Sequence, residues 1–528
     1  MLKQTLTFFA LTAVSLQMFM AQSYSIKWGD LEKRSARMVS ILPKSGADFY
    51  ALRYSGGMFG SYKFSMHDNF KITATGKIEM MADGSMANFE TARVIGGKLY
   101  VFLTDKKEGK NSIFMQEYAN DMTPKGTAKK LASFDLEKNR SRGFFDVINS
   151  RSKEFFGVIW EIPGKKEEKD LYGFKIFDDE MNEVSDGEYK LPFEGKLSTI
   201  HQHYLSNTGD YFISVMEYEE GDKKLFKSYV NYKATHILQI TPEGIEEFAI
   251  NLEGKRVEAM TMNSDNDRVM TLTGIYGDQG KAGVSGLFYM RADFAKQEVI
   301  DEGFSKFGKD FITQGWSDRQ KEKADKKSAK GKGDPQLYNY VMRQTEVLKD
   351  GSIVGSLEQY YVVVTTYTDP KTGATRTTYT YYYNDIVAFK VNKDGDFDWL
   401  KKINKYQVST NDGGPFSSYA RFVDNGKLCF IFNDNVKNYD ETAGKFIKPA
   451  SGKSVSPANF GKKKNVVAIV EIDLESGDES RKTFFDRKEI TAVAVPKEFV
   501  IDYSTNEMLL YAVYGKKEKF GLMSLDMD

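Results

Sequence analysis

Seven side chains that could do chemistry stand at corresponding places along the chain, each shortly before a tight turn. They are Arg93, Asp146, His203, Glu258, Glu346, Arg421 and Asp502. Charged groups that converge on a concave surface can bind a ligand or position acid–base chemistry. The same groups can also pair with one another, because a buried charge without a partner is costly. The sequence favours structural ion pairs and leaves a ligand site open, for which these seven residues are the candidates.

Two histidines have a spacing that is compatible with a metal ion. In the segment IHQHY, His201 and His203 are two residues apart, so in a strand both side chains point the same way. Zinc needs a third and usually a fourth ligand, and no paired His or Cys stands elsewhere in the sequence. We therefore predict no metal and no cofactor, with His201 and His203 as the weak candidates.

The sequence contains few of the short motifs that mark enzymes. The G-x-S-x-G elbow of a serine hydrolase is absent, and the single cysteine, Cys429, lies in an alternating apolar segment with no histidine close in sequence. A pair of glycosidase carboxylates leaves no local motif, however, and Glu258 and Glu346 are the carboxylates to test. The sequence thus leans toward a protein without enzymatic activity. A hydrolase or lyase that acts on carbohydrate or peptide stays the alternative.

The elements that must position these residues are strands almost throughout. Short runs alternate apolar and polar side chains and are bounded by Gly, Asn, Asp and Pro. Hairpins with turns such as TPKG, TPEG, NKDG and LESG follow one another in pairs, at intervals of roughly 45 to 70 residues. Two hairpins make a four-stranded unit, which is typical of a β-propeller blade. We count eight units, with seven as the alternative, and predict a single all-β propeller over residues 22–528.

The two ends of the chain are predicted to complete one blade together. The last unit supplies three strands, and residues 23–34 can supply the fourth, since Trp28 corresponds to Trp399 in the fourth strand of another unit. A blade built from both ends closes the ring and removes two exposed sheet edges. The seven candidate residues then lie on the innermost strands, near a central channel.

The N-terminus has the pattern of a secretory signal peptide. One Lys precedes an apolar run from Leu6 to Met20, so residues 1–21 are predicted to be removed after Ala21. No later apolar run approaches the roughly 20 residues of a membrane span, and we expect an exported protein without a transmembrane segment. Lys plus Arg equals Asp plus Glu, at 74 each, so no net field favours nucleic acid.

Two long segments interrupt the repeats. Residues 317–336 are too polar to bury anything and are expected to form a charged, flexible insertion. Residues 439–464 separate two strands of the seventh unit and are expected to form a loop insertion. Both should emerge on the faces of the ring, where loops commonly carry binding functions.

A third segment, residues 360–383, reads YYVVVTTYTDPKTGATRTTYTYYY and predicts a protruding β-hairpin. Its two arms of about ten residues are nearly twice the length of a usual strand, and a PKTG loop pairs Val364 with Tyr379. The tip carries threonines on both faces and few charges, so it gains little by burial and suits a contact surface. The candidate binding residues on it are Tyr367, Lys371, Arg376 and Tyr379.

Several stretches resemble an exported, β-propeller-like protein family of Bacteroidota. These are the signal ending AQ, the run YYYNDIVAFKVNKDGDFDWLKKINKYQ and the later SSYARF and FNDNVKN, and the similarity is clearest over residues 340–440. The resemblance implies a periplasmic, outer-membrane-associated or extracellular location and carries no catalytic residues. We expect a monomeric, non-enzymatic binding or scaffolding protein that recognises a protein or glycan of the cell envelope through the loops of a propeller face and the hairpin. A hydrolase or lyase at the central channel is the alternative.

Overall fold

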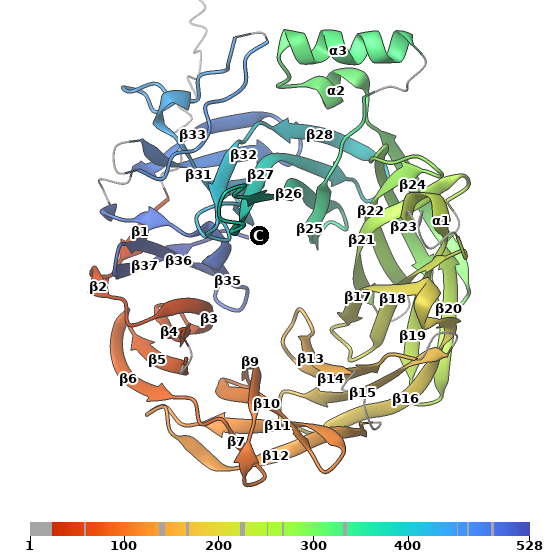
Figure 1. Ribbon diagram of the computed structural model, residues 1–528, viewed down its shortest axis with the longest axis vertical. Helices are drawn as coiled ribbons and strands as arrows, with labels where there is room; N and C mark the ends of the chain where they lie inside the picture. The colour runs from red at the N-terminus through yellow and green to blue at the C-terminus, as the bar shows by residue number, and fades with distance from the viewer. Residues whose placement is uncertain are drawn as a thin grey trace, which may run out of the picture.

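The described part of the chain forms eight antiparallel sheets of four or more strands, which stand around a common centre in this computed structural model (Figure 1). The structure describes residues 24–527, apart from 58–59, 137–142, 165–167, 222–227, 251, 267–268, 331–334, 451, 462–463 and 487–489. The predicted signal peptide, residues 1–21, lies outside the described residues. The predicted propeller of eight blades is confirmed, and the alternative of seven is wrong.

In the first seven sheets the strands follow one another in sequence, and the first strand is innermost (Figure 1). The first sheet contains β3 (Arg37–Ser45), β4 (Asp48–Tyr54), β5 (Tyr62–Asp68) and β6 (Lys71–Lys77). The second contains β9 (Asn88–Ile95), β10 (Lys98–Lys107), β11 (Lys110–Tyr118) and β12 (Pro124–Asp135). The third contains β13 (Phe144–Asn149), β14 (Phe155–Ile162), β15 (Lys169–Asp178) and β16 (Glu183–Glu194). The fourth contains β17 (Ser198–Leu205), β18 (Tyr211–Tyr218), β19 (Tyr232–Thr241) and β20 (Gly244–Ile250).

The next three sheets follow the same plan. The fifth contains β21 (Lys255–Asn266), β22 (Val269–Asp278), β23 (Gly286–Asp293) and β24 (Glu298–Lys306). The sixth contains β25 (Tyr340–Val347), β26 (Ile353–Thr368), β27 (Thr375–Val391) and β28 (Phe397–Ile403), and the short β29 (Gln407–Thr410) pairs with β27. The seventh contains β30 (Ala420–Asp424), β31 (Lys427–Asn435), β32 (Asn465–Asp473) and β33 (Glu479–Asp486).

The eighth sheet joins the two ends of the described chain. Its C-terminal strands are β34 (Val493–Ala494), β35 (Val500–Asp502), β36 (Glu507–Tyr514) and β37 (Lys517–Ser524). The N-terminal β1 (Ile26–Trp28) and β2 (Glu32–Lys33) both pair antiparallel with β37, and Ile26 lies opposite Met523. The predicted closure by an N-terminal strand is confirmed.

The core lies between neighbouring sheets, where their apolar faces meet. The rings of Phe102 and Phe156, from the second and third sheets, have centroids 6.0 Å apart, and those of Phe212 and Phe294, from the fourth and fifth, lie 5.5 Å apart. All four side chains are buried. Burying such a side chain contributes about 1.5–3 kcal/mol. The lone thiol, Cys429, is buried as well, so the fold depends on burial and hydrogen bonding.

Helices and short elements occupy the connections. The described residues contain the helices α1 (Ser228–Asn231), α2 (Lys309–Thr313) and α3 (Asp318–Ala329), the 3₁₀ turns η1 (Gly195–Leu197), η2 (Val436–Asn438) and η3 (Pro496–Glu498), and a small hairpin of β7 (Met81–Ala82) and β8 (Ser85–Met86). None of the helices in this part of the chain is long and apolar enough to cross a membrane.

Helix α3 corrects the expectation for residues 317–336. Ser317 caps its N-terminus: the hydroxyl accepts from the backbone N–H of Gln320, and the Gln320 side chain accepts from the backbone N–H of Ser317 at 2.8 Å. This reciprocal capping box satisfies two backbone donors at the start of the helix. Lys309 of α2 pairs with Asp325 at 2.7 Å, which attaches α3 to the body. The sequence analysis predicted a charged, flexible insertion here, and the polar composition gave no indication of the helix at residues 318–329.

Candidate binding sites: the arm and the central channel

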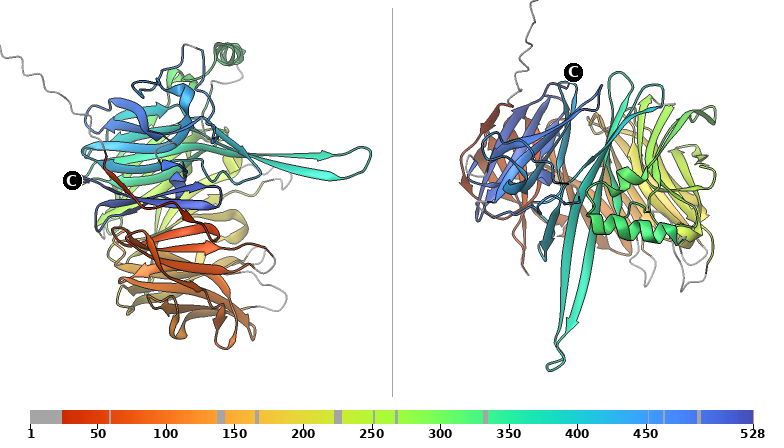
Figure 2. Two further views of the ribbon diagram at one scale, coloured as in Figure 1. Left: turned by 90° about the vertical axis from the view of Figure 1, so that its left-hand side faces the viewer. Right: turned by 90° about the horizontal axis from the view of Figure 1, so that it is seen from above.

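The longest hairpin among the described residues projects from one face of the ring (Figure 2). We call residues 361–379 the arm; they comprise the outer parts of β26 and β27 and the turn between them. The predicted register is confirmed, since Val364 lies opposite Tyr379, Val362 opposite Tyr381 and Tyr361 opposite Tyr382. At the tip, the Asp369 carboxylate accepts from the backbone N–H of Lys371 (2.7 Å) and of Thr372 (3.0 Å). These N–H groups lower the pKa of Asp369.

Tyrosines anchor the root of the arm to the ring. The rings of Tyr361 and Tyr382 stack with centroids 4.6 Å apart, and those of Tyr360 and Tyr383 are 4.7 Å apart. Lys497 of the eighth sheet donates to the Tyr383 hydroxyl at 3.3 Å and lies over its ring at 4.7 Å. Strand β29 adds a third strand beside β27 at Thr380–Tyr383. The arm therefore leaves the body as a supported ribbon.

Beyond its root the arm is exposed on both faces and along one edge. Val364 is 55% and Tyr367 60% exposed. On the side of β26, pairing with β25 ends where Asn339 accepts from the N–H of Tyr360 at 2.9 Å. From Tyr361 to Thr368, β26 pairs among the described residues only with β27, so its outer edge is open. The four candidates predicted from sequence, Tyr367, Lys371, Arg376 and Tyr379, all lie on the arm with exposed side chains.

Six of the seven predicted channel residues lie on the first, innermost strand of their sheets, and Asp502 lies on β35 at the inner side of the eighth sheet (Figure 1). Three of them are joined by a turn that crosses the channel. The turn after β13 carries Arg151, which donates to Glu346 Oε1 at 2.7 Å, while Arg421 donates to Glu346 Oε2 at 3.1 Å. The same turn carries Lys153, whose Nζ lies 3.7 Å from Oδ1 of Asp502. The third sheet is thereby tied to the sixth and eighth.

Three further candidates form a second group. Arg93 donates to Asn149 Oδ1 at 3.3 Å and to the Val147 carbonyl at 3.2 Å, both in the next sheet. Burial lowers the pKa of Arg93, and the charge of the neighbouring Asp146 opposes that shift. His203 is hydrogen-bonded through Nδ1 to the Tyr211 hydroxyl at 2.8 Å, and burial lowers its pKa to about 4. The imidazole is therefore neutral at pH 7.

The remaining candidates have local structural roles. Glu258 pairs with the buried Arg256 of its own strand. His201 accepts at Nε2 from the backbone N–H of Met260 at 3.1 Å, which links the fourth and fifth sheets. No group of three or more His, Cys, Asp or Glu side chains in the described ranges could hold a metal ion. The seven residues thus form separate contacts around the channel and do not meet in one site.

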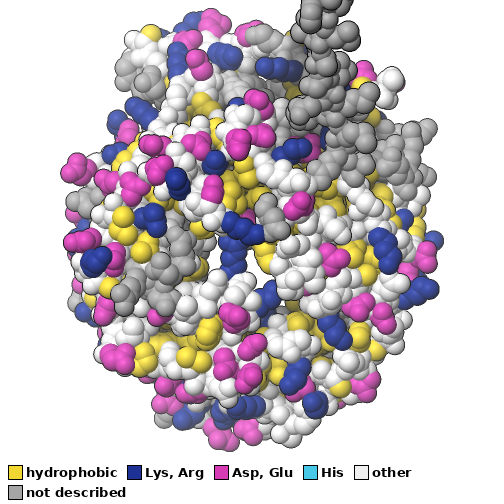
Figure 3. Space-filling model, turned by 180° about the vertical axis from the view of Figure 1, so that it is seen from behind, with side chains coloured by type: hydrophobic (Ala, Val, Ile, Leu, Met, Phe, Trp, Pro, Cys, Tyr) yellow, Lys and Arg dark blue, Asp and Glu magenta, His cyan; other side chains and the backbone are white. Residues whose placement is uncertain are grey.

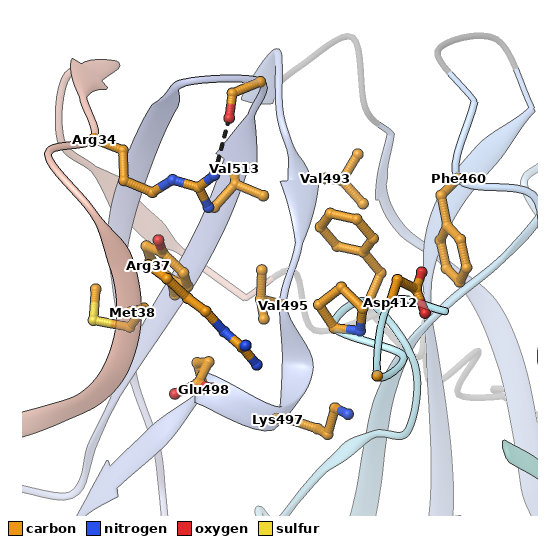
Figure 4. Close-up of a pocket in the computed structure, with 15 residues that line it drawn as sticks. Arg34, Arg37, Met38, Asp412, Phe460, Val493, Val495, Lys497, Glu498 and Val513 are labelled. Carbon is orange, nitrogen blue, oxygen red and sulfur yellow. Dashed lines mark hydrogen bonds between the residues drawn. The ribbon is translucent and has the colours of Figure 1, made fainter. Parts of the chain in front are cut away.

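A pocket of about 560 Å³ lies beside the root of the arm (Figure 4). Its charged lining residues are Arg34, Arg37, Asp412, Lys497 and Glu498, and its apolar ones include Val495 and Phe460. Arg37 extends toward the side formed by Lys497 and Glu498. Sequence reasoning missed this pocket because its walls come from the N-terminal segment, the loop after β29 and the eighth sheet. No local motif marks such a combination.

Comparisons with protein-family models and with curated proteins find no match. Among solved structures, the chain is similar to the WD40 domain of SCAP from fission yeast, at 9% identity over 95% of this chain and 94% of that one, with a TM-score of 0.36. It is also similar to the β-propeller domain of the Trilobed protease from Pyrococcus furiosus, at 11% identity over 84% and 97%, with a TM-score of 0.33. At these scores the likenesses add nothing to the architecture that the sheets define, and they carry no activity over to this chain.

Proposed function

We propose that this protein is a non-enzymatic binding or scaffolding protein of the bacterial cell envelope and that the arm is its contact with a protein partner. The observation that carries the proposal is the open edge of β26 from Tyr361 to Thr368. Exposed edge strands are usually blunted by charges, proline or bulges, since they otherwise pair with other chains. This edge has none of these: it reads YVVVTTYT and continues without a register shift.

The alternation of the strand identifies the groups that a partner would meet. The N–H of Tyr360 points away from β27, to Asn339, whereas the N–H of Asp369 points toward β27, to Ala374. Because successive residues of a strand alternate in direction, Val362, Val364, Thr366 and Thr368 present their N–H and C=O groups outward. An extended segment of a partner can add there as a further strand, with Tyr367 and neighbouring side chains giving specificity.

The location in the cell envelope is supported by the sequence. The apolar run from Leu6 to Met20 has the pattern of an export signal, and the resemblance to an exported Bacteroidota family points to the same compartment. The channel supports a binding role better than acid–base catalysis. Both carboxylate oxygens of Glu346 are engaged in ion pairs, one with Arg151 and one with Arg421, which is the arrangement of a structural contact.

A pair of substitutions at one arm position tests the proposal. Thr366→Pro removes an outward N–H and obstructs strand addition, yet keeps the bonds between β26 and β27. Thr366→Ala keeps the backbone donor and is the matched control. We expect wild-type protein and Thr366→Ala to enrich the same protein from envelope extract, and Thr366→Pro and a deletion of residues 366–377 to lose it.

Melting temperatures must show that all variants fold, which is expected because the deleted residues are largely exposed and contact chiefly one another. If the deletion and Thr366→Pro recover the same protein as wild type, the arm is not the contact. If the wild-type protein still captures material from an extract whose proteins have been digested by protease, the partner is a glycan. If light scattering shows dimers that the deletion abolishes, the arm binds a second copy of this chain; either result rejects a separate protein partner.

A further inference from the structure

A second cavity, of about 260 Å³, lies where the sixth, seventh and eighth sheets meet. Six residues line it: Arg343, Ser356, Ser418, Tyr419, Arg421 and Lys497. Three of the six are cations, three carry hydroxyl groups, and none is a carboxylate. Figure 3 shows Lys and Arg side chains gathered around the central opening on the face opposite the arm. The cavity shares Lys497 with the root of the arm, where this side chain contacts Tyr383, but the ligand inferred below does not depend on the function proposed for the arm.

Each cation reaches the cavity from a different sheet. Strand β25 has a register shift between Met342 and Thr345, so Arg343 stands in a β-bulge, a device that redirects side chains. Arg421 comes from β30, where its neighbours pair regularly with β31. Lys497 belongs to η3 and has an exposed side chain. Three sheets are needed to bring these three charges together.

The carboxylates beside the cavity, Glu358 and Glu346, already form ion pairs with cationic side chains. Glu358, which is 0% exposed, accepts from Lys405 at 2.8 Å and from the Ser418 hydroxyl at 2.7 Å, and it also pairs with Arg343. Burial alone would raise the pKa of Glu358, but the charges of Lys405 and Arg343 bring it below its ordinary value. Glu346, as described above, pairs with two guanidinium groups.

Positive charge therefore exceeds negative charge around the cavity. Two carboxylates, Glu358 and Glu346, are each paired with two cations. Lys497 adds a further positive charge, and among the described residues it forms no ion pair with a carboxylate; its Nζ donates to the Tyr383 hydroxyl. Burial lowers the pKa of Lys497, while the charges of Glu358, Glu498 and Asp412 oppose that shift.

One hydrogen-bond donor of Arg421, its Nε, has no acceptor among the described residues. Its side chain is 4% exposed and uses its two terminal nitrogens for Glu346 and the Val354 carbonyl. Its Nε is buried without a hydrogen-bond acceptor in the described part of the chain. Buried donors in folded proteins nearly always have a partner. Arg421 therefore keeps hydrogen-bonding capacity beside the cavity, and an anion placed in the cavity would offset the excess of positive charge.

We propose that this cavity binds the oxyanion group of a small molecule, namely a carboxylate, sulfate or phosphate. Lys497 and Arg343 supply charge at the open side, and Arg421 supplies charge at the buried side. The hydroxyls of Ser356 and Tyr419 share a hydrogen bond of 2.8 Å, which leaves one of them to donate to the ligand. The cavity, of about 260 Å³, has room for the charged group and a few further atoms, so the rest of a larger ligand extends into the channel.

Calorimetric titration of the full chain with sodium sulfate, sodium phosphate, acetate and glucuronate tests the proposal, with sodium chloride at matched ionic strength as reference. We expect wild-type protein to bind at least one oxyanion saturably. Lys497→Gln should weaken that binding by about tenfold, the usual size of a lost charged hydrogen bond, and Lys497→Arg should retain most of it. Lys107→Gln removes an exposed lysine of β10 far along the chain and should bind as wild type does.

Binding of sulfate or phosphate alone identifies an ester of those acids as the ligand class, and binding of acetate or glucuronate alone identifies an organic acid. The proposal is wrong if none of the four anions binds saturably or if Lys497→Gln binds as tightly as wild type. It is equally wrong if Lys107→Gln weakens binding as much as Lys497→Gln, because general screening would then explain the result. Equal melting temperatures of the three variants exclude loss of folding as the cause.

Discussion

Glu346 is the residue on which the contacts across the channel converge. Its carboxylate holds Arg151 from the third sheet and Arg421 from the seventh, and Arg421 is 4% exposed. Removing the negative charge leaves Arg421 buried without its carboxylate, which is the costly way to break a buried pair. We therefore expect Glu346→Gln to lower the free energy of unfolding by about 3 kcal/mol, measured by urea denaturation.

An exposed ion pair provides the control for this substitution. Glu183 pairs with Lys175 at 2.8 Å, and their side chains are 44% and 24% exposed. Glu183→Gln should change the free energy of unfolding by less than about 1 kcal/mol. Equal, small losses in both variants would show that the channel pair is not structural, and the channel carboxylates would then need testing as ligand contacts.

His67 gives the fold a dependence on pH. Its ring is 0% exposed, stacks on Phe49 with centroids 4.4 Å apart and donates from Nδ1 to the Phe70 carbonyl at 3.1 Å. Burial lowers the pKa of His67 to about 4. Between this value and the ordinary pKa of about 6.5, the unfolded chain binds a proton that the folded chain does not. Stability therefore falls as the pH drops through this range.

The size of this effect follows from the two pKa values. From pH 7 to pH 5, His67 should remove about 2 kcal/mol of stability. His67→Gln cannot take up the proton, so its free energy of unfolding should fall by about 2 kcal/mol less over the same interval, although the variant is less stable at pH 7. Urea denaturation of wild type and His67→Gln at the two pH values measures how much each loses in free energy of unfolding. Equal losses in the two proteins would assign the pH dependence to other groups.

At the scale of elements, the features that depend on a short stretch of sequence could be predicted. The register of the arm follows from the PKTG loop and from alternation, so the pairing of Val364 with Tyr379 could be predicted. Helix α3 was missed although its signal was local too. The SDRQ stretch contains the capping box of Ser317 and Gln320, but the prediction rested on the polar composition of the segment alone.

The contacts of the candidate sites could not be predicted in the same way. The sequence indicated that Glu346 and Arg421 are inward-facing charges, because each precedes a turn in the first strand of its unit. It gave no sign that Arg151, which is 195 positions from Glu346, reaches across the channel. Such pairings depend on the curvature of the closed ring and on the length of one turn, and neither has a local signature.

At the scale of the whole molecule, the ring depends on the contact between its two ends. Besides pairing with β37, the N-terminal segment places Trp28 against Phe485 of the seventh sheet, with ring centroids 5.6 Å apart. The first and eighth sheets are further joined by Arg53 and Glu518, which are both buried and lie 2.5 Å apart. Loss of β1 therefore exposes an edge of β37 and uncovers the apolar surface beside it.

A circularly permuted chain tests whether closure of the ring requires strand β1 itself or its position at the N-terminus. Because Ile26 lies opposite Met523 in an antiparallel pair, residues 24–34 can follow β37 through a short Asn-Gly turn, as in any other hairpin of the molecule. A permuted chain that starts at Ala36 and carries residues 24–34 after Met527 should melt within a few degrees of wild type. The same chain without the appended segment should aggregate or melt far lower. If the shortened chain folds as stably as the permuted one, β1 is dispensable and the seven complete sheets hold the ring by themselves.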